Sequence, residues 1–196
     1  MCGVSGAFDP HGGIDRALLD RMAATMRHRG PDHTGWYVSR DGRVGLAHNR
    51  LSIIDLSEAG NQPMAGRDEA LWIVFNGEIY NFPRLREELQ AKGERFRSQS
   101  DTEVIIKLYE AKGTGLLEDL SGMFAFCIYD AKRGSFFLAR DRVGIKPLYY
   151  VAKEGRFAFA SEPKALLKLP FVSRELDPLA LDAYFTLGYI PADLCI

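Results

Sequence analysis

The chain begins Met1-Cys2-Gly3-Val4-Ser5-Gly6-Ala7-Phe8, and this stretch decides both the expected fold and the expected chemistry. Its small and apolar residues predict a short buried strand, which the turn-forming segment 9–13 (Asp-Pro-His-Gly-Gly) ends. Processing enzymes remove an initiator methionine before small residues, so we expect Cys2 to become the first residue. The alternative is that Cys2 is simply a small residue after the start codon.

A terminal cysteine has two reactive groups on one residue. The ordinary pKa of a thiol is about 8.5 and that of an α-amine about 7.7–8.0, so a proton passes between them at little cost. Such an amine acts as the general base for other N-terminal nucleophiles. The pattern therefore predicts covalent catalysis at Cys2 without a partner histidine.

Hydrophobic periodicity predicts helices and strands along the rest of the chain. Helices are expected at 15–27, at 82–92 and behind a capping box formed by Ser100 and Glu103. Strands are expected at 34–39, 44–50, 71–75, 124–130, 135–140, 148–151 and 156–160, with a long loop at 56–69. Short turns between the later strands predict antiparallel hairpins. We expect an α+β fold, with helices outside two antiparallel sheets.

Composition excludes several classes of protein. The 196 residues are 46% hydrophobic and 26% charged with a net charge of −1, which gives no reason to expect nucleic acid or an anionic membrane as partner. No apolar run approaches the roughly 20 residues that span a bilayer. The N-terminus lacks the pattern of a secretory signal, so we expect a cytoplasmic protein. Three widely spaced cysteines and four scattered histidines predict neither disulfides nor a metal site.

Several longer motifs follow one another in order from residue 2 to about 191. They are Met1–Gly6, 27–32 (Arg-His-Arg-Gly-Pro-Asp), 50–56 (Arg-Leu-Ser-Ile-Ile-Asp-Leu), 60–64 (Gly-Asn-Gln-Pro-Met), 76–81 (Asn-Gly-Glu-Ile-Tyr-Asn), 100–103 (Ser-Asp-Thr-Glu), 140–150 (Arg-Asp-Arg-Val-Gly-Ile-Lys-Pro-Leu-Tyr-Tyr) and Ser161-Glu162. This series closely resembles the glutaminase domain of asparagine synthetases, which are class II, N-terminal-nucleophile glutamine amidotransferases. The 50–56 and 146–150 segments favour that family over glucosamine-phosphate synthase and the purine amidotransferase.

The resemblance implies a fold, an activity and a catalytic group. The fold is the four-layer sandwich of N-terminal-nucleophile hydrolases, with a glutaminase domain at residues 2–191 and the start of a linker to a synthetase domain at 192–196. The activity is hydrolysis of L-glutamine to glutamate and ammonia, with Cys2 as nucleophile and Asn76 and Gly77 as the oxyanion hole. From the residues alone, Asn-Gly after a strand predicts a hairpin turn, and the turn and the hole can be one object.

Glutamine recognition needs partners for an α-carboxylate and an α-ammonium. The resemblance assigns Arg50 to the carboxylate, which its guanidinium can grip with two parallel N–H bonds, and Asp101 to the ammonium. Taken alone, Arg50 would be a solvated surface charge, and Asp101 would be a favourable acid in the first turn of a helix. The family pocket is completed by backbone groups at Leu51, Ser52, Ile53 and Ile54 and beside Glu78.

The resemblance also defines partners and cofactors. The Ser-Gly-Gly-x-Asp-Ser loop with which synthetase domains bind ATP does not occur in the sequence, so we expect no cofactor here, and ATP and Mg²⁺ belong to the synthetase domain. Expected partners are L-glutamine and a synthetase domain in cis or in trans. The apolar segment 179–190 is expected to expose a patch or to drive self-association, so a homodimer is an open alternative.

A second interpretation is a catalytically silent docking module that holds a synthetase partner. Family members with that role typically lose the cysteine, whereas this chain keeps the whole set that glutamine hydrolysis needs. That set is Cys2, Arg50, Asn76, Gly77 and Asp101. An assay of glutamate release distinguishes the two interpretations.

Overall fold

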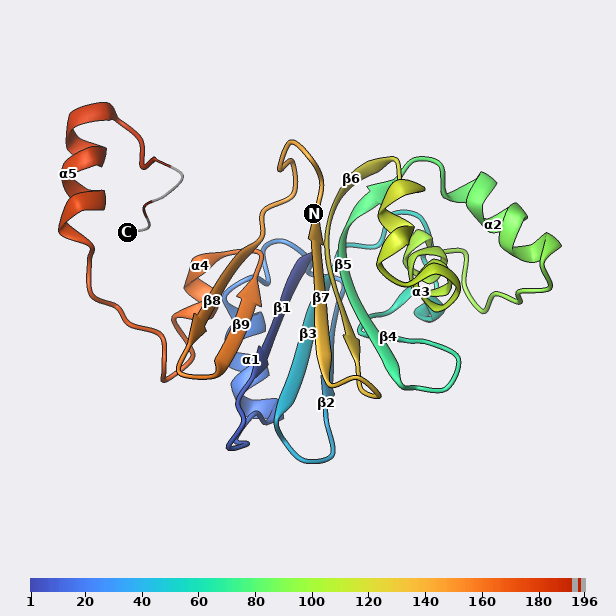
Figure 1. The fold of residues 1–196 in the computed structure, drawn as a ribbon, viewed down its shortest axis with the longest axis horizontal. Coiled ribbons are helices and arrows are strands. Elements are labelled where there is room, and N and C mark those ends of the chain that lie inside the picture. The colour runs from blue at the N-terminus through green and yellow to red at the C-terminus, as the bar shows by residue number, and fades with distance from the viewer. Residues whose placement is uncertain (192–193, 195–196) are drawn as a thin grey trace.

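Two antiparallel β-sheets lie face to face at the centre of the computed structural model, which describes residues 1–191 and Leu194 (Figure 1). The strands of sheet A are β1 (Gly3–Phe8), β2 (His33–Val38), β3 (Val44–Arg50), β8 (Tyr149–Lys153) and β9 (Arg156–Ala160). Those of sheet B are β4 (Met64–Ala65), β5 (Leu71–Ile79), β6 (Gly122–Asp130) and β7 (Ser135–Arg140). The spatial order is β2-β3-β1-β9-β8 in sheet A and β4-β5-β6-β7 in sheet B.

Helices cover the outer faces of both sheets. They are α1 (Arg16–Ala24), α2 (Phe82–Ala91), α3 (Asp101–Lys112) and α4 (Pro163–Leu166), with short 3₁₀ turns η1 (Glu58–Gly60) and η2 (Gly113–Glu118). A further helix, α5 (Pro178–Leu187), does not cover a sheet. Helix α1 packs on β1 and β3, α4 packs on β9, and α3 packs on β5 from the other side (Figure 1). The predicted α+β arrangement of two sheets between helices is confirmed.

The layer between the sheets is apolar in its middle and polar at one end. Buried side chains from both sheets fill the middle, among them Val4, Leu46, Val74, Cys127 and Phe159. Alternate residues of a strand point to the same face, so Cys2, His48 and Asn76 project into this layer. Cys2 lies two residues before Val4, His48 lies two residues after Leu46, and Asn76 lies two residues after Val74. All three of these neighbours belong to the core. The fold therefore gathers polar groups at one end of the sandwich.

Strand β5 is longer than the sequence predicts. The expected strand at 71–75 continues to Ile79, and Asn76 and Gly77 pair with Ala125 and Phe124 of β6. The hairpin interpretation of Asn-Gly is therefore wrong, because pairing with a long neighbouring strand outweighs the local turn preference. A Cβ atom at Gly77 would lie only 2.3 Å from the Met123 carbonyl oxygen, so this close approach requires glycine.

Two further local predictions need correction. Ser100 does cap α3, because its side chain accepts the Thr102 N–H, but Glu103 does not complete the expected box. Its carboxylate accepts the backbone N–H groups of Arg97 and Ser98 and the Ser98 hydroxyl, which together offer more donors than Ser100 alone. The loop predicted at 56–69 contains η1 and the short strand β4, which extends sheet B.

Helix α5 stands apart from the sandwich at the end of an extended segment (Figure 1). Leu179, Phe185 and Leu187 on this helix are exposed, as expected for the apolar segment 179–190. The expected linker at 192–196 lies outside the described residues except for Leu194. Every helix in the described ranges is too short or too polar to span a lipid bilayer.

Candidate active site

A cavity of about 230 Å³ opens at the polar end of the layer between the sheets. It brings together Cys2, Arg50, Leu51, Ile53, Ile54, Asn76, Gly77, Glu78 and Asp101, all of which are predicted site residues. Ser52 is the one predicted residue that does not line it, and its N–H donates to the Asp32 carboxylate instead (2.8 Å). The gathered residues come from the N-terminus, the end of β3, the middle of β5 and the start of α3.

The Cys2 thiol lies against the backbone that follows β3. The Leu51 N–H donates to Sγ at 3.4 Å, and Sγ lies 3.7 Å from the Leu51 carbonyl oxygen. Burial raises the pKa of this thiol, although the Leu51 N–H and the cationic Arg50 act in the opposite direction. The thiol is therefore protonated at neutral pH and needs a base before it can act as a nucleophile.

An arginine that sequence reasoning left without a role holds the backbone of Cys2. The Arg29 Nε donates to the Cys2 carbonyl oxygen at 2.9 Å, and its Nη1 contacts Glu162 at 3.0 Å. Burial opposes ionisation of Glu162, but hydrogen bonds from Lys164, Arg29 and His28 lower its pKa to about 2. The carboxylate stays ionised and fixes Arg29. The segment 27–32, one of the motifs that carry the family resemblance, thus lies beside Cys2.

Asn76 and Gly77 present donors to the cavity. The Asn76 side chain is buried, and its Nδ2 has no hydrogen-bond partner among the described residues. The N–H groups of Phe75 and Ile79 bond to side chains on the side of β5 away from β6, and residues two apart on a strand point the same way. The Gly77 N–H therefore points to that open side as well. Both residues line the cavity that also holds Cys2, so two donors are available there for an oxyanion.

Arg50 is held by its own loop rather than solvated. Its Nη1 donates to the Ser57 carbonyl oxygen (2.7 Å) and to Asn61 Oδ1 (2.8 Å), and its Nη2 donates to the Asp55 carbonyl oxygen. These partners use three of the five guanidinium N–H groups. The surface-charge interpretation is wrong, because the side chain is buried in the cavity wall.

Asp55 is a second residue that sequence reasoning missed. Its carboxylate accepts the Ser57 N–H (2.9 Å) and the Gln99 N–H (2.7 Å), which lies just before α3. It thereby fixes the loop that surrounds Arg50 to the segment that leads to Asp101. No motif spacing indicates this contact, since the partners are 44 residues apart.

Asp101 lies in the part of the cavity wall that the start of α3 forms. Its Oδ2 accepts the Ile79 N–H at 3.0 Å, and burial raises its pKa to about 6. A carboxylate taken out of water in this way gains from a cationic partner. The cavity thus has an anionic group at one wall and an arginine at another, which suits a ligand that bears both an ammonium and a carboxylate.

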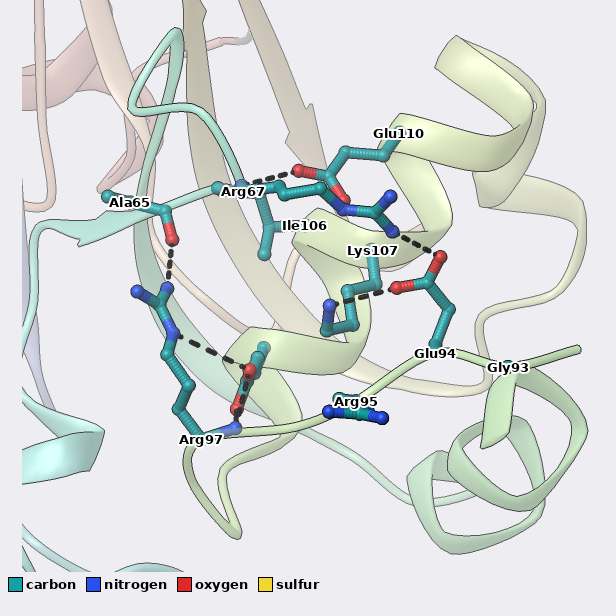
Figure 2. Close-up of a pocket in the computed structure, with 11 residues that line it drawn as sticks. Ala65, Arg67, Gly93, Glu94, Arg95, Arg97, Ile106, Lys107 and Glu110 are labelled. Atoms are coloured by element: carbon teal, nitrogen blue, oxygen red, sulfur yellow. Dashed lines mark hydrogen bonds and ion pairs between the residues drawn. The ribbon is translucent and has the colours of Figure 1, made fainter. Parts of the chain in front are cut away.

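A larger cavity of about 370 Å³ lies on the outer side of sheet B, between β4 and α3 (Figure 2). Its charged groups contact one another: Glu94 accepts from Arg67 (2.5 Å) and Lys107 (3.0 Å), and Glu110 accepts the Arg67 N–H (2.8 Å). No thiol or hydroxyl is among its lining residues. This cavity is larger, but it lacks a nucleophile and has few charges free to meet a ligand.

Comparison with known families agrees with this geometry. A family model described as a glutamine amidotransferase domain matches residues 1–196. The chain belongs to this family. Asparagine synthetase [glutamine-hydrolyzing] 1 of Bacillus subtilis (strain 168) is 43% identical over 195 residues, which cover 97% of this chain and 30% of that protein. Putative asparagine synthetase [glutamine-hydrolyzing] 2 of Methanocaldococcus jannaschii is 37% identical over 214 residues, covering 100% of this chain and 41% of that protein.

Two solved structures share the fold of this chain. Glutamine phosphoribosylpyrophosphate amidotransferase from B. subtilis superposes with a TM-score of 0.72 at 21% identity, covering 84% of this chain and 43% of that chain. A structure described as the allosteric regulatory enzyme of purine biosynthesis gives 0.73 at 22% identity. These likenesses confirm the expected N-terminal-nucleophile sandwich. The chain spans less than half of the length of the synthetases named above.

Proposed function

We propose that this amidotransferase domain hydrolyses the side-chain amide of L-glutamine to glutamate and ammonia, with Cys2 as the nucleophile. The observation that carries the proposal is one cavity that contains a half-buried thiol, a buried amide nitrogen without a partner among the described residues, and two opposite charges. Membership of the glutamine amidotransferase family supports the same reaction. Each step below is assigned to groups that line this cavity.

Substrate binding uses the charged walls of the cavity. The two guanidinium N–H groups that Arg50 has left bind the α-carboxylate of glutamine, and the Asp101 carboxylate binds its α-ammonium. Backbone groups at Leu51–Ile54 and beside Glu78 complete the pocket. With both ends of the amino acid held, the side-chain amide extends toward Cys2.

Acylation begins once removal of Met1 has freed the α-amine of Cys2. The amine takes the thiol proton, and Sγ forms a bond to the amide carbon of the substrate. Asn76 Nδ2 and the Gly77 N–H stabilise the oxyanion of the tetrahedral intermediate. The amine then returns its proton to the departing nitrogen, the C–N bond breaks, and ammonia leaves a glutamyl thioester on Cys2.

Deacylation repeats the sequence with water as the nucleophile. The α-amine accepts a proton from water as its oxygen bonds to the thioester carbon, and the same two donors hold the second oxyanion. The C–S bond breaks, the amine returns its proton to sulfur, and glutamate leaves. The reaction regenerates the thiol and needs no cofactor in this domain.

We place the glutaminase domain at residues 2–191 and propose that its ammonia serves asparagine synthesis at a synthetase domain supplied in cis or in trans. The relatives named as asparagine synthetases support this assignment, and they are much longer than this chain. ATP and Mg²⁺ belong to the synthetase domain. The homodimer and the cytoplasmic location stay predictions, and neither nucleic acid nor membrane is a proposed partner.

The test is glutamate release by purified protein shown by intact mass to lack Met1. The proposal predicts glutamate and ammonia in equal amounts, and their loss in the matched Cys2→Ser variant, because a hydroxyl is far less acidic than a thiol. The silent docking module remains the second candidate. It predicts no glutamate release from either protein and would replace the proposed function.

A further inference from the structure

The nucleophile and the oxyanion donors lie on different sheets. Cys2 adjoins β1 of sheet A, whereas Asn76 and Gly77 belong to β5 of sheet B. Catalysis by these groups requires sub-ångström alignment, so something must fix one sheet against the other at this end. Apolar packing fills the middle of the layer, but it is non-directional and does not by itself set the position of a strand edge.

Phe75, the residue that precedes the oxyanion donors, has side-chain partners on both of its backbone polar groups. Gln62 Oε1 accepts the Phe75 N–H at 2.7 Å, and His48 Nε2 donates to the Phe75 carbonyl oxygen at 3.0 Å. Strand β4 begins at Met64, which pairs with Ile73, so it does not reach Phe75. The two side chains thus replace the missing strand at the point where β5 enters the site.

Each of these side chains also links β5 to another part of the site. His48 lies on β3 two residues before Arg50, so its bond joins sheet A to the strand of the oxyanion donors. The Gln62 amide nitrogen donates to Thr102 Oγ1 at 3.1 Å, next to Asp101. Both side chains are buried. The nucleophile's sheet, the donors' strand and the helix of Asp101 are therefore linked through the backbone of one residue, Phe75.

We propose that His48 and Gln62 are positioning residues that hold the backbone on both sides of Phe75 and thereby align the Asn76 and Gly77 donors with Cys2. His48 does not line the cavity, and the Gln62 amide, which does, is already bonded to Thr102 and Phe75, so both residues act through the backbone of β5. The inference rests on the proposed function, since it assigns roles in that reaction. Burial lowers the pKa of His48 to about 3, so its ring is neutral, and a single proton on Nε2 serves the Phe75 carbonyl.

The test compares His48→Leu with His48→Gln, whose amide nitrogen can reach the same carbonyl. His48→Leu should lower kcat by about 10- to 100-fold, as misalignment of the donors would, while KM stays unchanged. His48→Gln should restore most of kcat. Gln62→Met, which removes the other contact, should repeat the kcat loss and keeps the test decisive if His48→Leu does not fold.

Two controls separate alignment from general damage. Leu46→Ala lies two residues away on the same face of β3 and should destabilise the sandwich without lowering kcat at temperatures well below unfolding. Alkylation of Cys2 by iodoacetamide, read from the mass of the N-terminal peptide, does not use the oxyanion donors and should proceed at the wild-type rate in His48→Leu.

The outcomes are distinct. A wild-type domain that releases no glutamate contradicts the proposed function itself. If the wild type is active, unchanged kcat in both His48→Leu and Gln62→Met overturns the positioning inference alone. A kcat loss in Leu46→Ala as large as in His48→Leu, or slowed alkylation of Cys2, would also overturn it, because the effect would then be general.

Discussion

The cavity beside Cys2 and the outer cavity between β4 and α3 differ in what their polar groups do. In the outer cavity between β4 and α3, carboxylates and cations contact each other, as Figure 2 shows for Glu94 with Arg67 and Lys107. In the cavity beside Cys2, the Asn76 amide has no partner among the described residues and Arg50 keeps two free N–H groups. The outer cavity is the larger of these two, yet most of its charged side chains already contact a partner within the protein.

Whether a polar group already has a partner within the protein therefore separates structural from functional polar groups. A buried donor without a partner lowers stability by roughly 1–3 kcal/mol, so a fold retains one only where something else benefits. A mutually paired cluster at the surface contributes little to stability and leaves no group for a ligand. Substitutions at the two cavities should therefore have very different consequences.

Replacing the nucleophile should give the largest effect. Cys2→Ala should lower kcat/KM for glutamine by on the order of 10⁴-fold or more, because no other thiol lines the cavity. Steady-state glutamate release measures this. Retention of more than a few per cent of the activity would mean that Cys2 does not form the covalent intermediate.

Removing the unpaired amide should give the next largest effect. Asn76→Ala should lower kcat by on the order of 10²–10³-fold while KM barely changes, because the oxyanion forms only on the way to the transition state. The variant should be no less stable than the wild type, since the lost amide had no partner. A rise in KM at constant kcat would assign Asn76 to substrate binding instead.

The buried carboxylate should show a conflict between stability and function. Asp101→Asn should raise KM by on the order of 10²-fold, because the substrate ammonium loses its counter-charge. The pKa of Asp101 is about 6 in the folded protein, against an ordinary value of 3.8. As pH rises from below 3.8 to above 6, ionisation of this carboxyl therefore lowers the free energy of unfolding by a total of about 3 kcal/mol.

Asp101→Asn should therefore be more stable than the wild type at pH 7.5 and show no gain near pH 4. The wild-type KM should rise as pH falls below 6, and that of the variant should not. Denaturant unfolding and KM measured across pH 5–8 check both statements. Equal stability of Asp101→Asn and the wild type at pH 7.5 would show that burial does not destabilise the ionised Asp101 carboxylate.

Replacing the guanidinium of Arg50 with an ammonium should have a smaller effect on KM than Asp101→Asn. Arg50→Lys should raise KM about tenfold with little change in kcat, since a point charge replaces two parallel N–H donors. Titration of the variant with glutamine gives both constants. A loss confined to kcat would show that Arg50 does not bind the α-carboxylate.

The outer cavity should show the smallest effect. Glu94→Gln removes the carboxylate that Arg67 and Lys107 share, and it should change stability by about 0–1 kcal/mol, with kcat and KM unchanged. The matched comparison is with Asp101→Asn, another acid-to-amide change. Loss of activity in Glu94→Gln would give the outer cavity a functional role.

Local sequence patterns predicted much of the fold. The strands 44–50, 135–140 and 156–160 have the expected bounds, because alternating apolar residues and Gly-containing turns are local signals. The course of β5 could not be predicted in this way, since Asn76-Gly77 favours a turn locally and becomes strand only through pairing with β6.

The residues of the site likewise fall into a predicted group and a group that was missed. Cys2, Arg50, Asn76 and Asp101 belong to motifs that resemble a known family, and the structure places all four in one cavity. The residues that hold them were missed, because their contacts join distant segments. Arg29 lies 27 residues from Cys2, and Phe75 lies 27 residues from His48 and 13 from Gln62. No single segment carries a signal for such pairs.

Glutamate release by two preparations of the same chain tests the central claim most directly, one lacking Met1 and one retaining it, each verified by intact mass. The account predicts that the first releases glutamate and ammonia in equal amounts and that the second is inactive, because an amide nitrogen cannot accept the Cys2 proton. Full activity in the protein that retains Met1 would contradict it.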